Sequence, residues 1–219
     1  MPEQIDTPYQ LVCEGKADEV FFRRLLLASG KVVNVSCPKP EPDGASGREA
    51  IRRRLVAFQS KFDTITRVVV VIDSDDDPAG ALGLGQEEFR QANLANPAKQ
   101  YPIPQAANVI ADGNPQTAIV QVPNEVQRGC LDTLLLPSFE ERYAGATLGC
   151  VHEFCQCVGD PARSYTFDSK LRLRSLISAT VFRNPGISLS FLLEERNCPI
   201  AISHASFDPI RATLIGLFP

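Results

Sequence analysis

The sequence of 219 residues lacks the features that mark membrane-spanning, secreted and disulfide-stapled proteins. No segment approaches the roughly 18 consecutive apolar residues that a membrane-spanning helix needs. The first residues lack the basic and then apolar pattern of a secretion signal. Seven cysteines, an odd number at irregular positions, do not form a disulfide framework. These absences predict a cytoplasmic protein with reduced thiols and no membrane association.

A broad positive charge is also absent. The formal net charge is -4 and the pI is near 5.3, which excludes a dedicated nucleic-acid coat protein. A nuclease is still compatible with this charge, because its acidic side chains gather at a metal site and meet phosphate through the ion. The sequence has no Gly-x-x-x-x-Gly-Lys-Ser/Thr motif, internal repeat or low-complexity tract. It therefore does not carry its own Walker-type ATPase.

What the sequence does contain is enough apolar residues, 44%, to bury a full core. Its first half alternates strand-like and helix-like segments, with Asp18 as the expected cap of the first helix and a Ser46/Glu49 capping box before the second. The expected strands cover 9–13, 32–35, 68–72, 109–110 and 118–122, and the expected helices cover 18–27, 51–58 and 86–94. The continuous β-branched run Val68–Ile72 is typical of a central strand covered on both faces. This alternation predicts an α/β fold with a mainly parallel, Rossmann-like, doubly wound sheet flanked by helices.

From Cys130 onward, the apolar residues recur at helical spacing. We therefore expect an α/β domain over residues 1–125 and a mostly helical C-terminal extension over 126–219, either separate or packed on the first as one unit. Within the extension, Ile187–Phe191 alternates like a strand, whereas Pro209–Leu217 suits a short final helix.

Acidic residues follow two of the expected strands. Glu14-Gly15-Lys16 comes after the first strand, and Asp73-Ser74-Asp75-Asp76-Asp77 comes after the central one. Ligands of an open parallel sheet bind beyond the carboxyl ends of its strands. Carboxylates about 4 Å apart repel by roughly 4 kcal/mol at an effective dielectric constant near 20, and a bound cation removes that repulsion. Oxygen ligands without histidine or thiolate favour hard ions such as Mg²⁺. Each motif alone also fits an ordinary solvated loop.

The order and spacing of the two motifs resemble the Toprim domain of topoisomerases, primases and OLD-family nucleases. In that domain, a strand-end Glu-Gly and a later strand-end Asp-x-Asp form the active site. The matching residues are Val12–Lys16 and Val71–Asp75, and the likeness covers residues 9 to about 123. It is strongest to the small stand-alone OLD-like Toprim proteins, most of which lack an established activity. The segments Gly129–Leu136 and Ser169–Leu171 also look like that group.

The resemblance implies a Toprim-like sheet and a role for each matched residue. Glu14 would act as a general acid/base or share the metal, Asp73 and Asp75 would hold Mg²⁺ or Mn²⁺, and Asp77 would assist them. The implied function is that of a divalent-metal-dependent nuclease or phosphodiester-transfer protein acting on nucleic acid. The alternative is a non-catalytic metal-binding module with a regulatory or partner-binding role. Because OLD-type Toprim domains often work fused to an ATPase, the resemblance also allows a separately encoded ATPase as a partner.

Two other families share part of the aspartate pattern. Asp73-x-Asp75-x-Asp77 begins like a calcium-binding EF-hand loop, but Pro78 replaces the turn glycine and Leu84 replaces the bidentate acid. A phosphatase of the haloacid-dehalogenase type also has Asp-x-Asp after an apolar strand. Its next alternate residue is usually Thr or Val, and such an enzyme would leave Glu14 without a role.

Several further residues have both a functional and a structural interpretation. Lys16 could contact phosphate or be a solvated turn residue, and Gly44 and Gly47 could form the glycine-bearing turn of a Toprim fold or a plain flexible loop. The soft ligands of Cys150–Cys157 could bind zinc, but their spacing favours buried structural thiols. His204 has no evident catalytic partner. The basic residues that could guide a nucleic-acid backbone, or simply form solvated helix faces, are Arg52, Arg53, Arg54, Lys170, Arg172 and Arg174.

Overall fold

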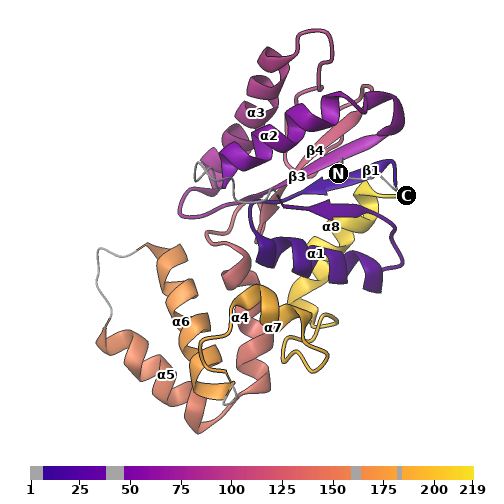
Figure 1. Ribbon diagram of the computed structural model, residues 1–219. Helices are drawn as coiled ribbons and strands as arrows, with labels where there is room; N and C mark the ends of the chain where they lie inside the picture. The colour runs from indigo at the N-terminus through magenta and orange to yellow at the C-terminus, as the bar shows by residue number, and fades with distance from the viewer. Residues whose placement is uncertain (1–6, 38–46, 159–163, 182–183) are drawn as a thin grey trace.

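A four-stranded parallel sheet forms the centre of the protein (Figure 1). The computed structural model describes residues 7–37, 47–158, 164–181 and 184–219. In spatial order, the strands are β2 (Asn34–Ser36), β1 (Tyr9–Val12), β3 (Arg67–Asp73) and β4 (Gln116–Val122). All neighbouring pairs run parallel. The predicted parallel α/β sheet flanked by helices is therefore confirmed.

Helices cover both faces of this sheet, as the β-branched run of β3 predicts. Val69 and Val71 face one hydrophobic cluster, whereas Val68, Val70 and Ile72 face the other. The alternation follows from the two-residue period of a strand. One face is covered by α2 (Arg48–Gln59) and α3 (Pro78–Ala95), and the opposite face by α1 (Lys16–Ala28) and α8 (Asp208–Leu217) (Figure 1).

The C-terminal part is helical, as predicted. It contains α4 (Leu131–Arg142), α5 (Ala146–Cys157), α6 (Tyr165–Thr180) and α7 (Leu189–Glu194), and the short 3-10 helices are η1 (Phe62–Thr64) and η2 (Ala205–Phe207). Leu135, Leu173 and Leu193 from these helices share one hydrophobic cluster with Phe21 of α1 and Val69 of β3. The helices therefore pack against the α1 side of the sheet through a continuous core.

The first helix begins earlier than the sequence pattern suggested. Gly15 is the N-cap of α1, and Asp18 lies in the first turn instead of capping it. The prediction of Asp18 as a cap is wrong, because the chain enters the helix directly after the strand-end Glu-Gly. The second helix begins after Gly47, and Ser46 of the predicted capping box lies outside the described residues.

Two expected strands differ in the structure. The segment near Val109–Ile110 forms no strand among the described residues, and only an isolated bridge joins Ala111 to Thr117. The strand-like alternation of Ile187–Phe191 instead leads into α7, where the Ser188 hydroxyl accepts a hydrogen bond from the Phe191 N–H at 3.3 Å. A serine cap and apolar residues at helical spacing outweigh the short alternation there.

Candidate metal and phosphate site

The carboxyl ends of β1 and β3 bring Glu14 and Asp73 together. Val12 of β1 pairs with Val70 of β3, so the residues that follow each strand leave the sheet at the same edge. The Asp73 backbone lies close enough to the Glu14 carboxylate to lower the pKa of Glu14. The two predicted site residues are therefore close neighbours, although they lie far apart in the sequence.

The loop after β3 is held by the segment that follows β4. The Asp75 N–H donates to the Gly129 carbonyl at 2.7 Å, and the Gly129 N–H donates back to Asp75 at 2.6 Å. The Ser74 hydroxyl donates to the Asn124 carbonyl at 2.8 Å. Asp75 has a φ of 44°, a left-handed conformation that aspartate tolerates better than most residues. This clamping limits the directions in which the Asp75 carboxylate can move.

Two further carboxylates and one lysine join this cluster, and sequence reasoning did not assign them to the site. Asp18 comes from the first turn of α1, Asp132 from the first turn of α4, and Lys170 from α6. Their charges act on Asp73 or on one another. Asp18 follows Glu14 by four residues, whereas Asp132 and Lys170 lie within segments that already resembled OLD-like proteins. The likeness of those two segments was a sequence signal for Asp132 and Lys170. The sequence did not show that the two residues lie near Glu14 and Asp73 in the folded chain.

Burial and mutual repulsion make the ionised form of this cluster unfavourable. Burial first, and then the Asp75 charge, raise the pKa of Glu14. Burial, Asp18 and Glu14 raise the pKa of Asp73 well above its usual range. The pKa of Asp18 rises to about 7, mainly through burial and then through the charges of Glu14 and Asp132. A cation bound among these groups would relieve the repulsion.

Three cationic side chains offset part of this charge. Arg48 at the start of α2 and Lys170 both lower the pKa of Glu14, and Arg174 and Lys170 lower that of Asp132. Burial by itself would lower the Lys170 pKa, but Cys130, Asp73 and Asp132 raise it. Cations from α2 and α6 therefore flank the acidic cluster from different parts of the chain.

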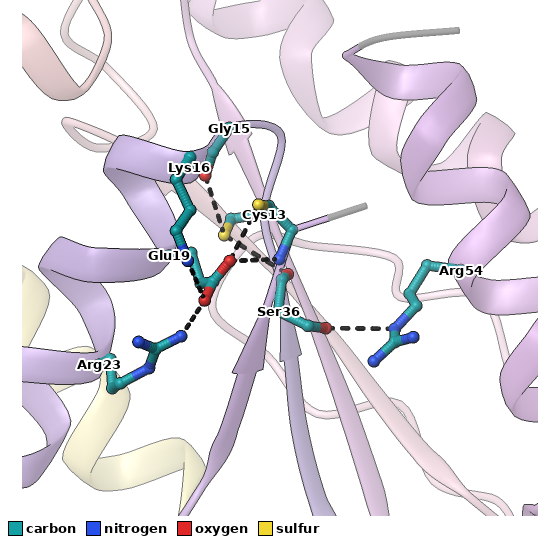
Figure 2. Close-up of polar contacts among 8 residues, drawn as sticks. Cys13, Gly15, Lys16, Glu19, Arg23, Ser36 and Arg54 are labelled. Atoms are coloured by element: carbon teal, nitrogen blue, oxygen red, sulfur yellow. Dashed lines mark hydrogen bonds and ion pairs between the residues drawn. The ribbon is translucent and has the colours of Figure 1, made fainter. Parts of the chain in front are cut away.

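The loop that carries Glu14 is anchored by a separate polar network (Figure 2). The Cys13 thiol contacts the Gly15 carbonyl at 3.8 Å and the Ser36 carbonyl at 3.6 Å. Glu19 forms ion pairs with Arg23 and with Lys16, the latter at 2.9 Å. Lys16 therefore has a structural partner on α1, and its predicted contact with phosphate stays a prediction.

The turn before α2 also approaches Glu14. Gly47 has a φ of 60°, and a Cβ atom at this position would lie 3.6 Å from Glu14 Oε2. A glycine therefore provides the left-handed turn that brings the start of α2 beside the carboxylate. Gly44, the other glycine predicted for this turn, lies outside the described residues.

A model of one protein family matches residues 8–195, from the first strand through α7. The chain belongs to the DUF3226 family. This family is described as proteins of unknown function, so membership assigns no activity. No curated protein and no solved structure matches the chain. Among the described residues, no helix is long and apolar enough to cross a membrane.

The donors of this DUF3226 chain suit a hard divalent ion in chemistry. Glu14, Asp73 and Asp75 offer only oxygen ligands. Asp132 is 9% exposed, and its Oδ1 has no hydrogen-bond partner within the described residues, as expected of an atom available to a ligand. Within the same part of the chain, no three His, Cys, Asp or Glu side chains are placed to hold a metal ion. Metal binding therefore requires the carboxylates to rotate toward each other.

Asp77 has a structural partner outside this cluster. Its Oδ1 accepts a hydrogen bond from the Gly80 N–H at 3.0 Å and caps α3. The neighbouring Asp76 accepts from the Thr166 N–H at 3.2 Å and links the loop to α6. The role of Asp77 as a metal ligand stays a prediction, and its cap holds one carboxylate oxygen at the start of α3.

Most of the other candidates have structural partners. Arg52 pairs with the buried Glu88 at 3.0 Å, and Arg172 pairs with Glu140 at 2.6 Å. His204 caps η2, and its Nε2 lies 2.8 Å from Glu141 Oε2. These contacts favour structural roles for the three residues.

The prediction of buried thiols is wrong for part of α5. Cys150 and Cys157 are exposed, and Cys155 is half-buried. The reason is that α5 packs mainly against α6, so most of its surface stays in solvent.

Asp18 leads to a prediction about pH. Its pKa is about 7 in the folded chain and 3.8 ordinarily, so between these values the folded state binds more protons than the unfolded state. Protonated Asp18 therefore stabilises the folded state, and this stabilisation, at most roughly 4 kcal/mol, is lost as pH rises from about 4 to about 7. Asp18→Asn should stabilise the protein at pH 8 and have little effect near pH 4 in urea unfolding with EDTA. An equal effect of the substitution at both pH values would contradict the prediction.

Proposed function

We propose that this DUF3226 chain is a divalent-metal-dependent, Toprim-type nuclease or phosphodiester-transfer protein that acts on nucleic acid. The observation that carries the proposal is the gathering of Glu14, Asp18, Asp73 and Asp75 around the carboxyl ends of β1 and β3, beside Lys170. The likeness of Glu14-Gly15 and Asp73-Ser74-Asp75 to OLD-like Toprim motifs supports the same function.

Each residue of the cluster has a chemical role in this proposal. Asp73, Asp75 and Glu14 would hold Mg²⁺ or Mn²⁺, with Asp132 as an added oxygen donor. The bound ion would supply Lewis-acid stabilisation of a phosphoryl oxygen and a water of lowered pKa. Glu14 could alternatively exchange a proton with the attacking or leaving oxygen, and its raised pKa suits that role better than the pKa of an ordinary carboxylate. The Lys170 ammonium would neutralise a non-bridging phosphate oxygen.

The proximity of Glu14 and Asp73 favours this proposal over a phosphatase that uses Asp73 as its nucleophile. In the phosphatase, Glu14 has no task, and a second carboxylate beside the nucleophile would repel the incoming phosphate. In a metal-dependent site, the same carboxylate helps to hold the ion. The Asp73 backbone beside Glu14, which lowers the Glu14 pKa, places that carboxylate next to the proposed ion.

The second candidate is a metal-binding module without catalysis. It is favoured by the net charge of -4, because an acidic protein attracts the phosphates of nucleic acid poorly. Such a module would close around its ion only with a partner, of which a separately encoded ATPase is one example. It would bind metal but would not cleave nucleic acid alone.

Calorimetric titration with MnCl₂ and MgCl₂ tests the proposal, together with nicking of supercoiled plasmid by the same samples. We expect both metals to bind and nicking to depend on metal and stop with EDTA. Metal binding without nicking would favour the non-catalytic module. Absence of metal binding would overturn both candidates.

A further inference from the structure

Two cysteines lie opposite each other where β1 and β2 end. In the parallel register of these strands, Val12 pairs with Ser36. The Cys13 N–H donates to the Ser36 carbonyl at 3.1 Å, which continues the ladder by one residue. In a parallel ladder, each residue bonds to the neighbours of its partner, so the partner of Cys13 is Cys37. The two cysteines are therefore adjacent in space, although β1 and β2 are separated by the whole of α1.

Both thiols lie on the α1 side of the sheet. Cys13 is fully buried in the hydrophobic cluster that contains Phe21 of α1, and the half-buried Cys37 packs against the same cluster. The Cys37 thiol donates to Glu19 Oε2 of α1 at 3.0 Å. The Cys13 thiol contacts the Ser36 carbonyl at 3.6 Å, in the network of Figure 2. The two side chains therefore leave neighbouring strands in the same direction.

This arrangement suits a disulfide bond. Neighbouring strands are about 4.8 Å apart, and a disulfide usually joins Cα atoms about 4.4–6.8 Å apart. Rotation of the two side chains would therefore bring the sulfurs together with little backbone movement. Burial, and then the charges of Asp18 and Cys37, raise the pKa of Cys13, which agrees with a short distance between the thiols. Burial also raises the pKa of Cys37. Both thiols therefore stay protonated at neutral pH, and both are free in the structure.

A bond between these cysteines would act on the loop that carries Glu14. Cys13 directly precedes Glu14, and its thiol contacts the Gly15 carbonyl at 3.8 Å. A disulfide would remove this contact and tie the end of β1 to the end of β2. The Glu14 carboxylate lies beside Asp73 and has to turn toward the other carboxylates to share an ion. Oxidation of Cys13 would therefore restrict the carboxylate next to it.

We propose that Cys13 and Cys37 are a modification site at which small organic disulfides form a reversible cross-strand disulfide bond that weakens metal binding through Glu14. The effect on the metal rests on the proposed function, whereas formation of the bond does not. The inference therefore adds control by oxidants to the acidic cluster.

The reaction proceeds by two thiol–disulfide exchanges. The half-buried Cys37 reacts first: its sulfur attacks one sulfur of the oxidant, forms a mixed disulfide and releases one thiol. The buried Cys13 sulfur then attacks Cys37 Sγ and displaces the second thiol. The two protons of the cysteines end on the two released thiols. Two protein thiols are thus oxidised while one disulfide of the reagent is reduced, and an excess of dithiothreitol reverses both steps.

Mass spectrometry of the full-length protein tests formation of the bond. The protein is incubated with excess 2-hydroxyethyl disulfide in EDTA, its remaining thiols are blocked with N-ethylmaleimide, and it is digested without reduction. We expect one pair of peptides joined through Cys13 and Cys37, and dithiothreitol should separate them. After removal of reagent and EDTA, calorimetry with MnCl₂ should show affinity lower by about tenfold or more, the usual effect of disturbing residues that support metal ligands. Reduction should restore the affinity.

Two serine variants separate the bond from other effects of the oxidant. Cys37→Ser cannot form the bond, and its hydroxyl can donate to Glu19 as the thiol does. Cys13→Ser is the second variant, because its hydroxyl can donate to the Ser36 carbonyl. Both variants should bind Mn²⁺ equally well before and after treatment with the oxidant. Their unfolding in urea, compared with that of the wild type, shows that the fold is retained.

Cys150 and Cys157 of α5 provide a control for geometry within the same protein. Both are exposed, so the oxidant reaches them more easily than it reaches Cys13. Seven helical positions separate them by about 10 Å, beyond the roughly 7 Å between Cα atoms that a disulfide can bridge. They should carry the reagent as mixed disulfides without joining to each other. Cys150→Ser/Cys157→Ser should still form the bond between Cys13 and Cys37.

Absence of the bond between Cys13 and Cys37 in protein whose Cys150 carries the reagent would overturn the inference. Unchanged Mn²⁺ affinity in the cross-linked protein would overturn the proposed control of Glu14. If the bond forms but the reduced protein binds no metal, only the proposed function fails. If the reduced protein binds metal and the bond does not form, only the inference fails.

Discussion

The double variant Asp73→Asn/Asp75→Asn is expected to lose divalent-metal binding and all metal-dependent nicking, yet to fold more stably than the wild type at neutral pH. Amides keep the size of the side chains but are weaker ligands for Mg²⁺ or Mn²⁺. Removal of residues that only support a ligand typically weakens metal binding about 10- to 100-fold, so loss of two ligands should exceed roughly 100-fold. Calorimetry and plasmid nicking measure both effects.

The gain in stability distinguishes this variant from one that simply misfolds. Burial and the charges of Asp18 and Glu14 raise the pKa of Asp73, so ionised Asp73 destabilises the folded state. Its replacement by a neutral amide should raise the free energy of unfolding at pH 8 in EDTA.

Asp63→Asn is the matched control, because this carboxylate is 91% exposed and precedes β3 at the other end of the strand. It should change neither metal binding nor stability. Wild-type metal affinity in the double variant would show that the cluster does not bind the ion.

Lys170→Gln is expected to slow cleavage by about 100- to 1,000-fold, the usual effect of removing a group that stabilises developing charge. The ammonium lies within the field of Asp73, Asp75 and Asp132, where it competes with a metal ion for the same carboxylates. Metal affinity should therefore stay equal or increase slightly while the rate falls. Single-turnover nicking at saturating Mn²⁺, with calorimetry on the same protein, separates these effects.

Two companion variants sharpen the Lys170 experiment. Lys170→Arg keeps the charge and should retain part of the rate. Lys61→Gln removes an exposed lysine at the amino end of β3 and should leave the rate unchanged. A full cleavage rate in Lys170→Gln would rule out a catalytic contribution from this ammonium.

The strands were predictable where their burial leaves a strong local pattern. The β-branched residues of β3 and β4 are covered on both faces, and both strands lie close to their predicted positions. The pair Val109–Ile110 has a similar composition, but only an isolated bridge forms nearby. A short apolar pair indicates a preference for extended backbone. It does not indicate whether a neighbouring strand is in place to pair with it.

The sequence by itself determined that Glu14, Asp73 and Asp75 follow strands of a parallel sheet, and parallel strands of one sheet end at a common edge. Only the tertiary structure decided that Asp132 and Lys170 join them, because α4 and α6 reach the site through long-range packing on the α1 side of the sheet. It also decided that Asp77 caps α3. Local sequence patterns indicate which face of a segment is buried. Which element covers that face depends on contacts between residues far apart in the chain.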